Sequence, residues 1–269
     1  MSHIHGTDSE PDPCVDRRIG KDWARGLTAA TDARVARAAA AHRGRRYRTR
    51  SRAETIEWTA ELAYALGLLA TDGCLSADGW HIAFVSADEE LVRTLLACIG
   101  RPQLRYVRSL SRIGNPVYRT SVSHVALYSW LEERGLTPRK SLTLGALDVP
   151  SEFLLHVVRG LLDGDGSIYV RQQRPTRRTY PGYVYVRLWT YFCSASADHI
   201  VWLRARLEAA LGIRGWVERT SRPDRKPFYR LRFGKRDSLV LLRQLYADPR
   251  WPALERKRAK RIGDESGMA

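Results

Sequence analysis

The segments Ala65-Leu-Gly-Leu-Leu-Ala-Thr-Asp-Gly73 and Val158-Arg-Gly-Leu-Leu-Asp-Gly-Asp-Gly166 are variants of one pattern. In each segment an apolar run that contains a glycine ends in an Asp-Gly pair, and the two final aspartates are 93 positions apart. Each run has the composition of a buried helix. The repetition indicates that the chain consists of two similar halves.

Both final aspartates, Asp72 and Asp165, stand at the C-terminal end of a predicted helix. The helix dipole is negative at that end, so a carboxylate there is electrostatically unfavourable. Asp-Gly is also a common helix stop, which would explain one copy on structural grounds. Two copies in the same context favour a function, most simply a pair of metal ligands.

Gly67 and Gly160 lie inside the two predicted helices, where glycine costs roughly 1 kcal/mol relative to alanine. Close packing of one helix on the other would explain both. If the helices pack around a local twofold axis, Asp72 and Asp165 become neighbours, and their repulsion requires a cation. Oxygen ligands alone select a hard ion, so we expect Mg²⁺. The glycines after them, at 73 and 166, are expected to be left-handed caps.

Downstream of each motif the hydrophobic pattern predicts two strands, a helix, two strands and a further helix. The expected fold class is therefore α+β, with two pseudo-symmetric αββαββα repeats that each form an antiparallel sheet. The predicted repeats cover residues 55–148 and 149–262. Residues 1–54 are either a basic N-terminal arm or a small DNA-binding module, and residues 263–269 a disordered tail.

The chain has 269 residues, with 45 Lys and Arg against 29 Asp and Glu, a formal net charge of +16 and a pI near 10.2. This charge favours a polyanionic partner, above all nucleic acid. No apolar stretch approaches the roughly 20 residues of a membrane-spanning helix. The four cysteines form no CxxC pair, and no secretory signal is recognisable, so we expect an intracellular, cytoplasmic protein associated with the nucleoid.

One predicted strand shows how a sheet could bind nucleic acid. Alternate residues of segment 183–192 are apolar, while the residues between them are aromatic or basic, as a half-buried strand requires. We expect the second set to contact DNA, although a solvated sheet surface would show the same alternation. The predicted DNA-binding residues are Tyr183, Tyr185, Arg187, Trp189 and Tyr191 on this strand, Arg119, Arg230 and Arg232 on other strands, and Arg171, Arg174, Arg177 and Arg178 in a basic hairpin segment.

The two motifs resemble the paired signatures of LAGLIDADG homing endonucleases in their single-chain form. The resemblance covers about residues 55–262. It implies a saddle of two antiparallel sheets on a long, asymmetric DNA site, bound by one monomer. It also implies Mg²⁺-dependent hydrolysis of both strands with Asp72 and Asp165 as catalytic metal ligands, and basic side chains at Lys140 and Lys257 near the active sites. The first motif departs from the family pattern at Ala70, where an acidic residue is usual.

Two alternative functions fit the same pattern. A basic, aromatic sheet also suits an RNA-binding splicing factor, or maturase, that acts on intron RNA. A catalytically silent DNA-binding regulator could use the same surfaces. Retention of both Asp72 and Asp165 favours the endonuclease, because a protein that only binds a polyanion has no need of two adjacent carboxylates.

Overall fold

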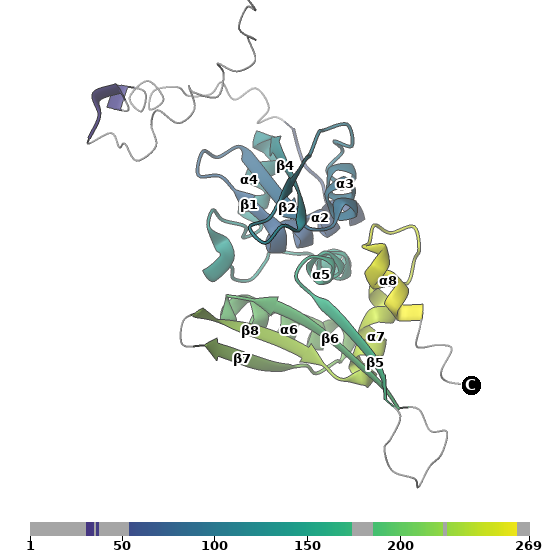
Figure 1. The fold of residues 1–269 in the computed structure, drawn as a ribbon. Helices are drawn as coiled ribbons and strands as arrows, with labels where there is room; N and C mark the ends of the chain where they lie inside the picture. The colour runs from purple at the N-terminus through teal and green to yellow at the C-terminus, as the bar shows by residue number, and fades with distance from the viewer. Residues whose placement is uncertain (1–30, 35, 38–53, 174–184, 223–224, 263–269) are drawn as a thin grey trace, which may run out of the picture. The chain divides into compact units, whose positions relative to one another are not determined.

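The computed structural model describes residues 31–34, 36–37, 54–173, 185–222 and 225–262. The chain divides into two compact units, Met1–Arg50 and Ser51–Ala269. In the first unit, residues 33–34 and 36–37 are helical, and the Asp32 carboxylate accepts from the Arg34 backbone N–H at 2.7 Å. The second unit contains both motifs and the two four-stranded sheets of the described residues (Figure 1). The predicted tail 263–269 and most of the predicted arm lie outside the described residues.

The first repeat begins with α2 (Ala60–Asp72), which carries the first motif and is capped by the Thr59 hydroxyl. Four strands and two further helices follow it: β1 (Gly73–Leu75), β2 (His81–Ser86), α3 (Glu89–Cys98), β3 (Val107–Leu110), β4 (Pro116–Ser123) and α4 (Val125–Glu133). The strands form one antiparallel sheet in the order β1-β2-β4-β3.

The second repeat has the same order of elements. After a 3₁₀ turn (Ser151–Phe153) come α5 (Leu154–Asp163), β5 (Ser167–Gln173), β6 (Tyr185–Ser194), α6 (Ala197–Leu211), β7 (Trp216–Arg222), β8 (Arg225–Phe233) and α7 (Lys235–Leu245). Its sheet has the equivalent order β5-β6-β8-β7. The predicted α+β class with two αββαββα repeats is confirmed. A further helix, α8 (Glu255–Ile262), follows the second repeat.

The two motif helices, α2 and α5, pack directly against each other, and Gly67 and Gly160 lie at their contact. A methyl group on Gly67 would lie 2.2 Å from the Val157 carbonyl oxygen, and one on Gly160 would lie 2.2 Å from the Tyr64 carbonyl oxygen. No side chain fits at such distances. The cost of glycine inside each helix is therefore offset by close backbone packing.

The prediction of left-handed caps at Gly73 and Gly166 was wrong. Gly73 has φ −87° and ψ 160°, and neither glycine has a positive φ. A methyl group would instead lie 2.5 Å from the Leu69 carbonyl oxygen at Gly73, and 2.7 Å from that of Leu162 at Gly166. Both glycines are required because the chain turns back tightly over its own helix.

Each sheet has one face packed on its helices and an outer face directed away from them. On the packed face of β2, Ile82 and Phe84 are buried, while residues 81, 83 and 85 between them remain partly exposed. Strand β6 alternates in the same way, with Leu188 and Phe192 in the core. The period-2 pattern read from the sequence therefore separates the core from the outer face.

Candidate active site and nucleic-acid interface

Asp72 is the last residue of α2, and Asp165 lies two residues beyond the end of α5. Because these helix ends are side by side, a methyl group on Gly164 would lie 3.2 Å from Asp72 Oδ2. Burial, together with the charge of Asp165, raises the pKa of Asp72 to about 7. Loss of hydration also raises the pKa of Asp165, although that side chain reaches solvent. The carboxylates predicted to be neighbours are close enough to interact electrostatically.

Two buried lysines flank these carboxylates. Lys140, in the short 3₁₀ turn Lys140–Leu142, donates to the carbonyl oxygen of Gly73. Lys257, in α8, donates to the carbonyl oxygen of Gly166 at 2.8 Å. Each lysine therefore binds the glycine that follows the motif aspartate of its own repeat. Both ammonium groups lower the pKa values of Asp72 and Asp165 and partly oppose the effect of burial.

The two lysines differ in how fully they are engaged. Lys257 Nζ also donates to the carbonyl oxygens of Leu162 at 2.6 Å, Asp163 at 2.8 Å and Gly164 at 3.2 Å. It thus closes the C-terminal end of α5, where a cation complements the helix dipole. Burial lowers its pKa to about 8. Lys140 makes one such bond and also lines a cavity of about 150 Å³ beside Asp165.

The earlier acidic residue of the second motif, Asp163, does not face the site. It is fully buried and accepts hydrogen bonds from Tyr64 Oη at 2.8 Å, Tyr246 Oη at 2.7 Å and the Leu254 backbone N–H at 2.8 Å. This carboxylate ties α5 to α2 and to the segment that leads into α8. Ala70 occupies the equivalent position of the first motif and is also buried, so that motif lacks only this structural anchor.

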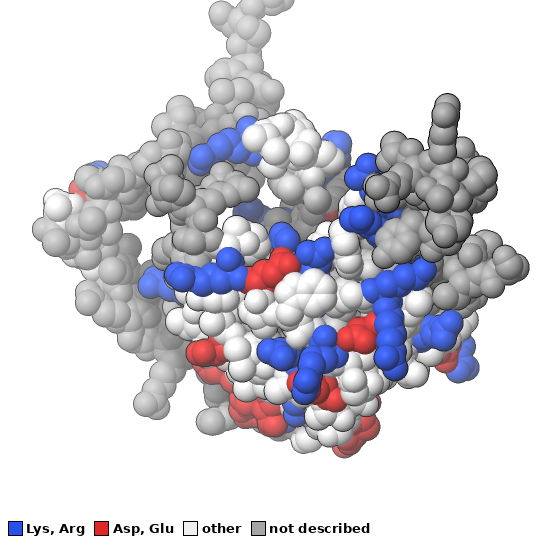
Figure 2. All heavy atoms as spheres, turned by 90° about the horizontal axis from the view of Figure 1, so that it is seen from below, with Lys and Arg blue, Asp and Glu red and all other residues white. Residues whose placement is uncertain are grey.

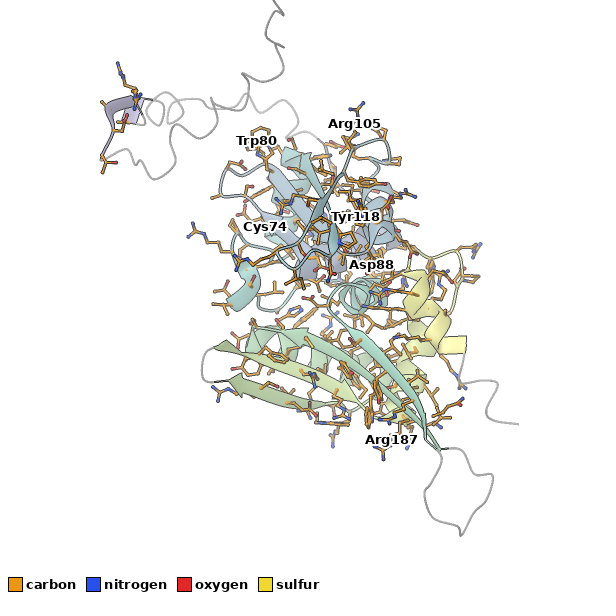
Figure 3. The ribbon with its side chains drawn as sticks, in the orientation of Figure 1. Cys74, Trp80, Asp88, Arg105, Tyr118 and Arg187 are labelled. Atoms are coloured by element: carbon orange, nitrogen blue, oxygen red, sulfur yellow. The ribbon has the colours of Figure 1, made fainter. Side chains whose placement is uncertain are left out.

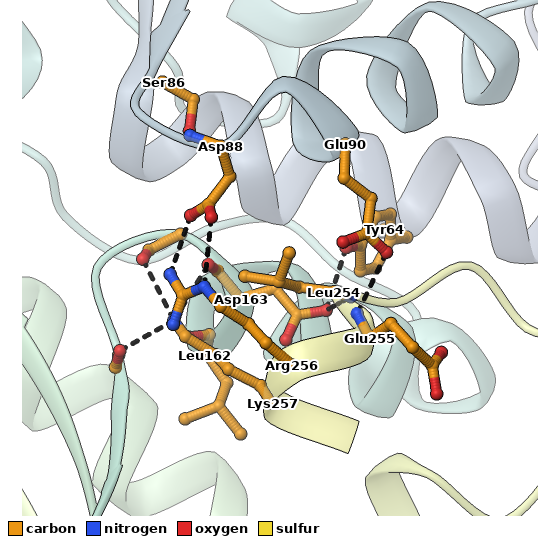
Figure 4. A network of polar contacts seen from close by, with 12 residues as sticks. Tyr64, Ser86, Asp88, Glu90, Leu162, Asp163, Leu254, Glu255, Arg256 and Lys257 are labelled. Carbon is orange, nitrogen blue, oxygen red and sulfur yellow. Dashed lines mark hydrogen bonds and ion pairs between the residues drawn. The ribbon is translucent and has the colours of Figure 1, made fainter. Parts of the chain in front are cut away.

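Helix α8 also fastens the second repeat to the first, as Figure 4 shows. Arg256 donates to Asp88 through Nε at 3.0 Å and Nη2 at 2.7 Å, and the Glu255 backbone N–H donates to Glu90 at 3.0 Å. Both acidic residues lie at the N-terminus of α3. The same helix therefore carries Lys257 to the site and holds the repeats together.

The site offers two carboxylates as ligands for a hard divalent cation. Within residues 54–173, 185–222 and 225–262, no larger group, of three or more His, Cys, Asp and Glu side chains, could hold a metal ion. Mg²⁺ is commonly held by one or two carboxylates, with water and substrate phosphate completing its ligands. Asp72 and Asp165 provide that minimum, and their mutual repulsion would be relieved by a cation.

The outer face of the second sheet carries several of the predicted DNA-binding residues. Arg187 projects from β6 (Figure 3) and pairs in register with Arg171 on β5, and both are exposed. Trp189 and Tyr191 follow on the same face as Arg230 and Arg232. Tyr183, Arg174, Arg177, Arg178 and the side chain of Tyr185 lie outside the described residues. Arg119 lies on the outer face of the first sheet, opposite Val85.

Three further residues on the outer face of the second sheet were not identified from the sequence. Tyr169 stacks on Trp189 with ring centroids 5.3 Å apart, and Trp216 and Glu218 contact Arg232. Alternation along the segment from Trp216 to Thr220 would have placed residues 216 and 218 on one face. That signal is weak because Trp216 and Val217 are both apolar, so the sequence does not show which of them faces the core. Figure 2 shows Lys and Arg side chains spread over one side of the molecule with acidic ones among them.

No protein-family model matches this sequence, and no curated protein matches it. In the described part of the chain, no helix has the length and apolar character needed to cross a membrane. Solved structures do resemble the fold. One is full-length DUF199/WhiA from Thermatoga maritima (TM-score 0.47, 12% identity, 79% of this chain), of which the chain spans 63%.

Two other similar structures are homing endonucleases bound to DNA. The structure of I-DmoI in complex with DNA and Ca has a TM-score of 0.49 and 16% identity, covering 76% of this chain and 97% of that one. The homing endonuclease I-WcaI bound to its DNA recognition sequence has a TM-score of 0.49 and 9% identity, covering 76% and 88%. The structural neighbours of this chain are LAGLIDADG homing endonucleases and the LAGLIDADG domain of DUF199/WhiA.

Proposed function

We propose that this protein is a site-specific DNA endonuclease that hydrolyses phosphodiester bonds with Mg²⁺. The observation that carries the proposal is the meeting of Asp72 and Asp165 at the ends of α2 and α5. No packing or capping requirement explains two carboxylates at this position, whereas Asp163 shows how a purely structural carboxylate is buried and bonded. The arginines on the outer face of the second sheet supply attraction for the DNA backbone.

Three groups of residues have separate roles in this proposal. Asp72 and Asp165 would hold the cation, which when bound supplies charge stabilisation for the phosphate and an activated water. Lys140 and Lys257 fix the backbone just beyond each aspartate and favour the charged carboxylates. Arg187 and its neighbours on β5 and β8 would hold DNA against the sheet. The unequal halves suit an asymmetric site bound by one monomer.

The test is cleavage of DNA by the purified full chain. A library of random duplexes is incubated with Mg²⁺, and cut molecules are recovered and sequenced to identify a site. Asp72→Asn and Asp165→Asn are expected to abolish cutting of that site while binding in Ca²⁺ persists. Asp148→Asn is the matched control, because this exposed carboxylate of the linker between the repeats should leave cutting unchanged.

Cutting that survives both substitutions would exclude the proposed metal ligands. Specific binding without any cutting by the wild type would instead support the catalytically silent regulator.

A second candidate is recognition of single-stranded RNA, such as intron RNA. The observation that favours it is the stack of Tyr169 on Trp189, continued by Arg232 at 4.1 Å from the Trp189 ring. Partly exposed aromatic rings with interleaved arginines also suit unpaired bases. Competition between duplex DNA and an RNA pool for the same protein decides between the two, since an endonuclease should retain its DNA site in excess RNA.

A further inference from the structure

Glu218 is an acidic side chain on the edge strand β7, beside arginines and aromatic rings of the outer face of the second sheet. Its Oε1 accepts from Trp216 Nε1 at 2.9 Å and from Arg232 Nη1 at 3.1 Å, and its Oε2 lies 3.5 Å from Arg230 Nη1. The Trp216 and Arg232 hydrogen bonds hold the pKa of Glu218 below its usual range. The side chain is therefore an anion at neutral pH and links the two arginines.

Aromatic rings add to the support of both guanidinium groups. Arg232 lies over Trp189 at 4.1 Å and Trp216 at 5.2 Å, and Arg230 lies over Tyr191 at 5.1 Å. Stacking fixes the plane of a guanidinium, and the carboxylate fixes its rotation within that plane. The conformational entropy that free arginines would lose on binding is thus lost already in folding.

The first sheet lacks this arrangement at the equivalent place. Arg119 pairs in register with Val85 and Val107, whereas Arg230 pairs with Cys193 and Glu218. In the first sheet a valine therefore stands where the second has its glutamate. Among the described residues, no carboxylate or aromatic ring contacts the Arg119 guanidinium.

A carboxylate on this face needs an explanation, because it weakens attraction for a polyanion. If the surface served only to neutralise phosphates, Glu218 would lower affinity for DNA and bring no benefit. Orientation of the arginines is such a benefit, since a planar guanidinium group held in one direction can match a particular hydrogen-bonding pattern. Guanine presents two acceptors, O6 and N7, in the major groove, and a bidentate arginine is the usual reader of that pair.

We propose that Arg230 and Arg232 read guanine bases in the half of the DNA site that faces the second sheet, and that Glu218 is the positioning residue that orients them. The proposal rests on the DNA recognition proposed above and adds the base chemistry of one half-site. The half-site facing the first sheet is then read without such a supported pair, since the cross-strand partners of Arg119 are valines.

The experiment compares wild type with Glu218→Gln, Arg232→Lys and Arg119→Lys. Each full-length protein selects sites from the same random duplex library in Ca²⁺, and affinity is then measured for the wild-type site and for versions with single G·C pairs changed to A·T. Glu218→Gln keeps the shape of the side chain and removes its charge. Thermal unfolding of each variant confirms that it folds.

We expect both Glu218→Gln and Arg232→Lys to reduce discrimination at the same G·C pairs, on the order of ten- to a hundredfold. Affinity of Glu218→Gln for non-specific duplex should be equal or higher, since a negative charge has gone. Arg119→Lys should leave those pairs unaffected and alter preference only in the other half of the site.

The proposal is overturned if Glu218→Gln binds every duplex more tightly with an unchanged base profile, which is the result for a counter-charge that does not orient its partners. It is also overturned if Arg232→Lys retains the wild-type profile. Failure of the wild type to select any DNA sequence would contradict the proposed function itself, so the two failures are distinguishable.

Discussion

Lys140 and Lys257 donate to the carbonyl oxygens of Gly73 and Gly166, the residues that directly follow Asp72 and Asp165. The two repeats thus place equivalent ammonium groups beside equivalent carboxylates, although the lysines are delivered by a 3₁₀ turn in one repeat and by α8 in the other. The equivalence is incomplete, because Lys257 binds three more carbonyl oxygens at the end of α5.

This difference predicts that substitution of Lys257 mainly lowers stability, whereas substitution of Lys140 mainly lowers DNA cleavage. Lys257→Met should lower the free energy of unfolding by about 3 kcal/mol, because it leaves buried carbonyl groups without a donor. Lys140→Met should lower the free energy of unfolding by only about 1 kcal/mol, because one hydrogen bond is lost. It should strongly reduce cleavage of one DNA strand. Urea unfolding and a strand-resolved cleavage assay measure the two effects. Equal losses of stability would show that the capping role is shared.

The contact of Gly67 with Gly160 predicts that neither glycine tolerates a methyl group. Gly67→Ala and Gly160→Ala should each destabilise the protein by about 3 kcal/mol, because the added carbon would press on a backbone carbonyl oxygen that cannot move aside. Gly145→Ala is the matched control, since its methyl group would meet no atom within 4 Å. Urea unfolding of the three variants checks this. Native stability of Gly67→Ala would contradict the observed helix approach.

The raised pKa of Asp72 predicts a pH-dependent effect on stability. Its pKa rises from 3.8 to about 7 on folding, so the folded state holds the proton more tightly between those values. Stability from this group is therefore present at pH 4 and is lost as the pH rises to 7. Asp72→Asn should be more stable than wild type at pH 8, on the order of 1 kcal/mol after allowance for solvent screening, and similar at pH 4.

Unfolding of this variant at the two pH values, with and without Mg²⁺, provides the measurement. Since Mg²⁺ should bind only the folded wild type, it should remove the advantage of the variant at pH 8. A variant less stable than wild type at both pH values would mean that the Asp72 carboxylate is stabilised in the folded protein.

The buried Asp163 predicts a large effect of two tyrosine hydroxyl groups that are themselves buried in the core. Tyr64→Phe and Tyr246→Phe should each cost about 1–3 kcal/mol, because Asp163 would lose a hydrogen bond without gaining water. Tyr229→Phe is a suitable control, as the hydroxyl of this partly exposed residue has no partner among the described residues. Denaturant unfolding gives the values, and two substitutions without effect would show that Asp163 is satisfied by the Leu254 N–H alone.

Local pattern in the sequence determined most of the fold. Helix and strand positions followed from periodicity, because periodicity depends on residues near one another in the chain. The duplication and the close helix contact followed from comparing two short segments, since the second repeats the first and each has a glycine inside its helix. The meeting of Asp72 with Asp165 also followed, once the two helices were taken to be related by symmetry.

Tertiary structure decided what the individual polar groups do. Asp163 and Asp165 are two residues apart, yet one is sealed between tyrosines and the other reaches solvent. The burial of Lys257 and the link from Glu218 to Arg230 and Arg232 depend on strand register and on the return of α8. Sequence alone determined the two-repeat scaffold because its signals are local, whereas these roles arise from contacts between distant segments that only packing brings together.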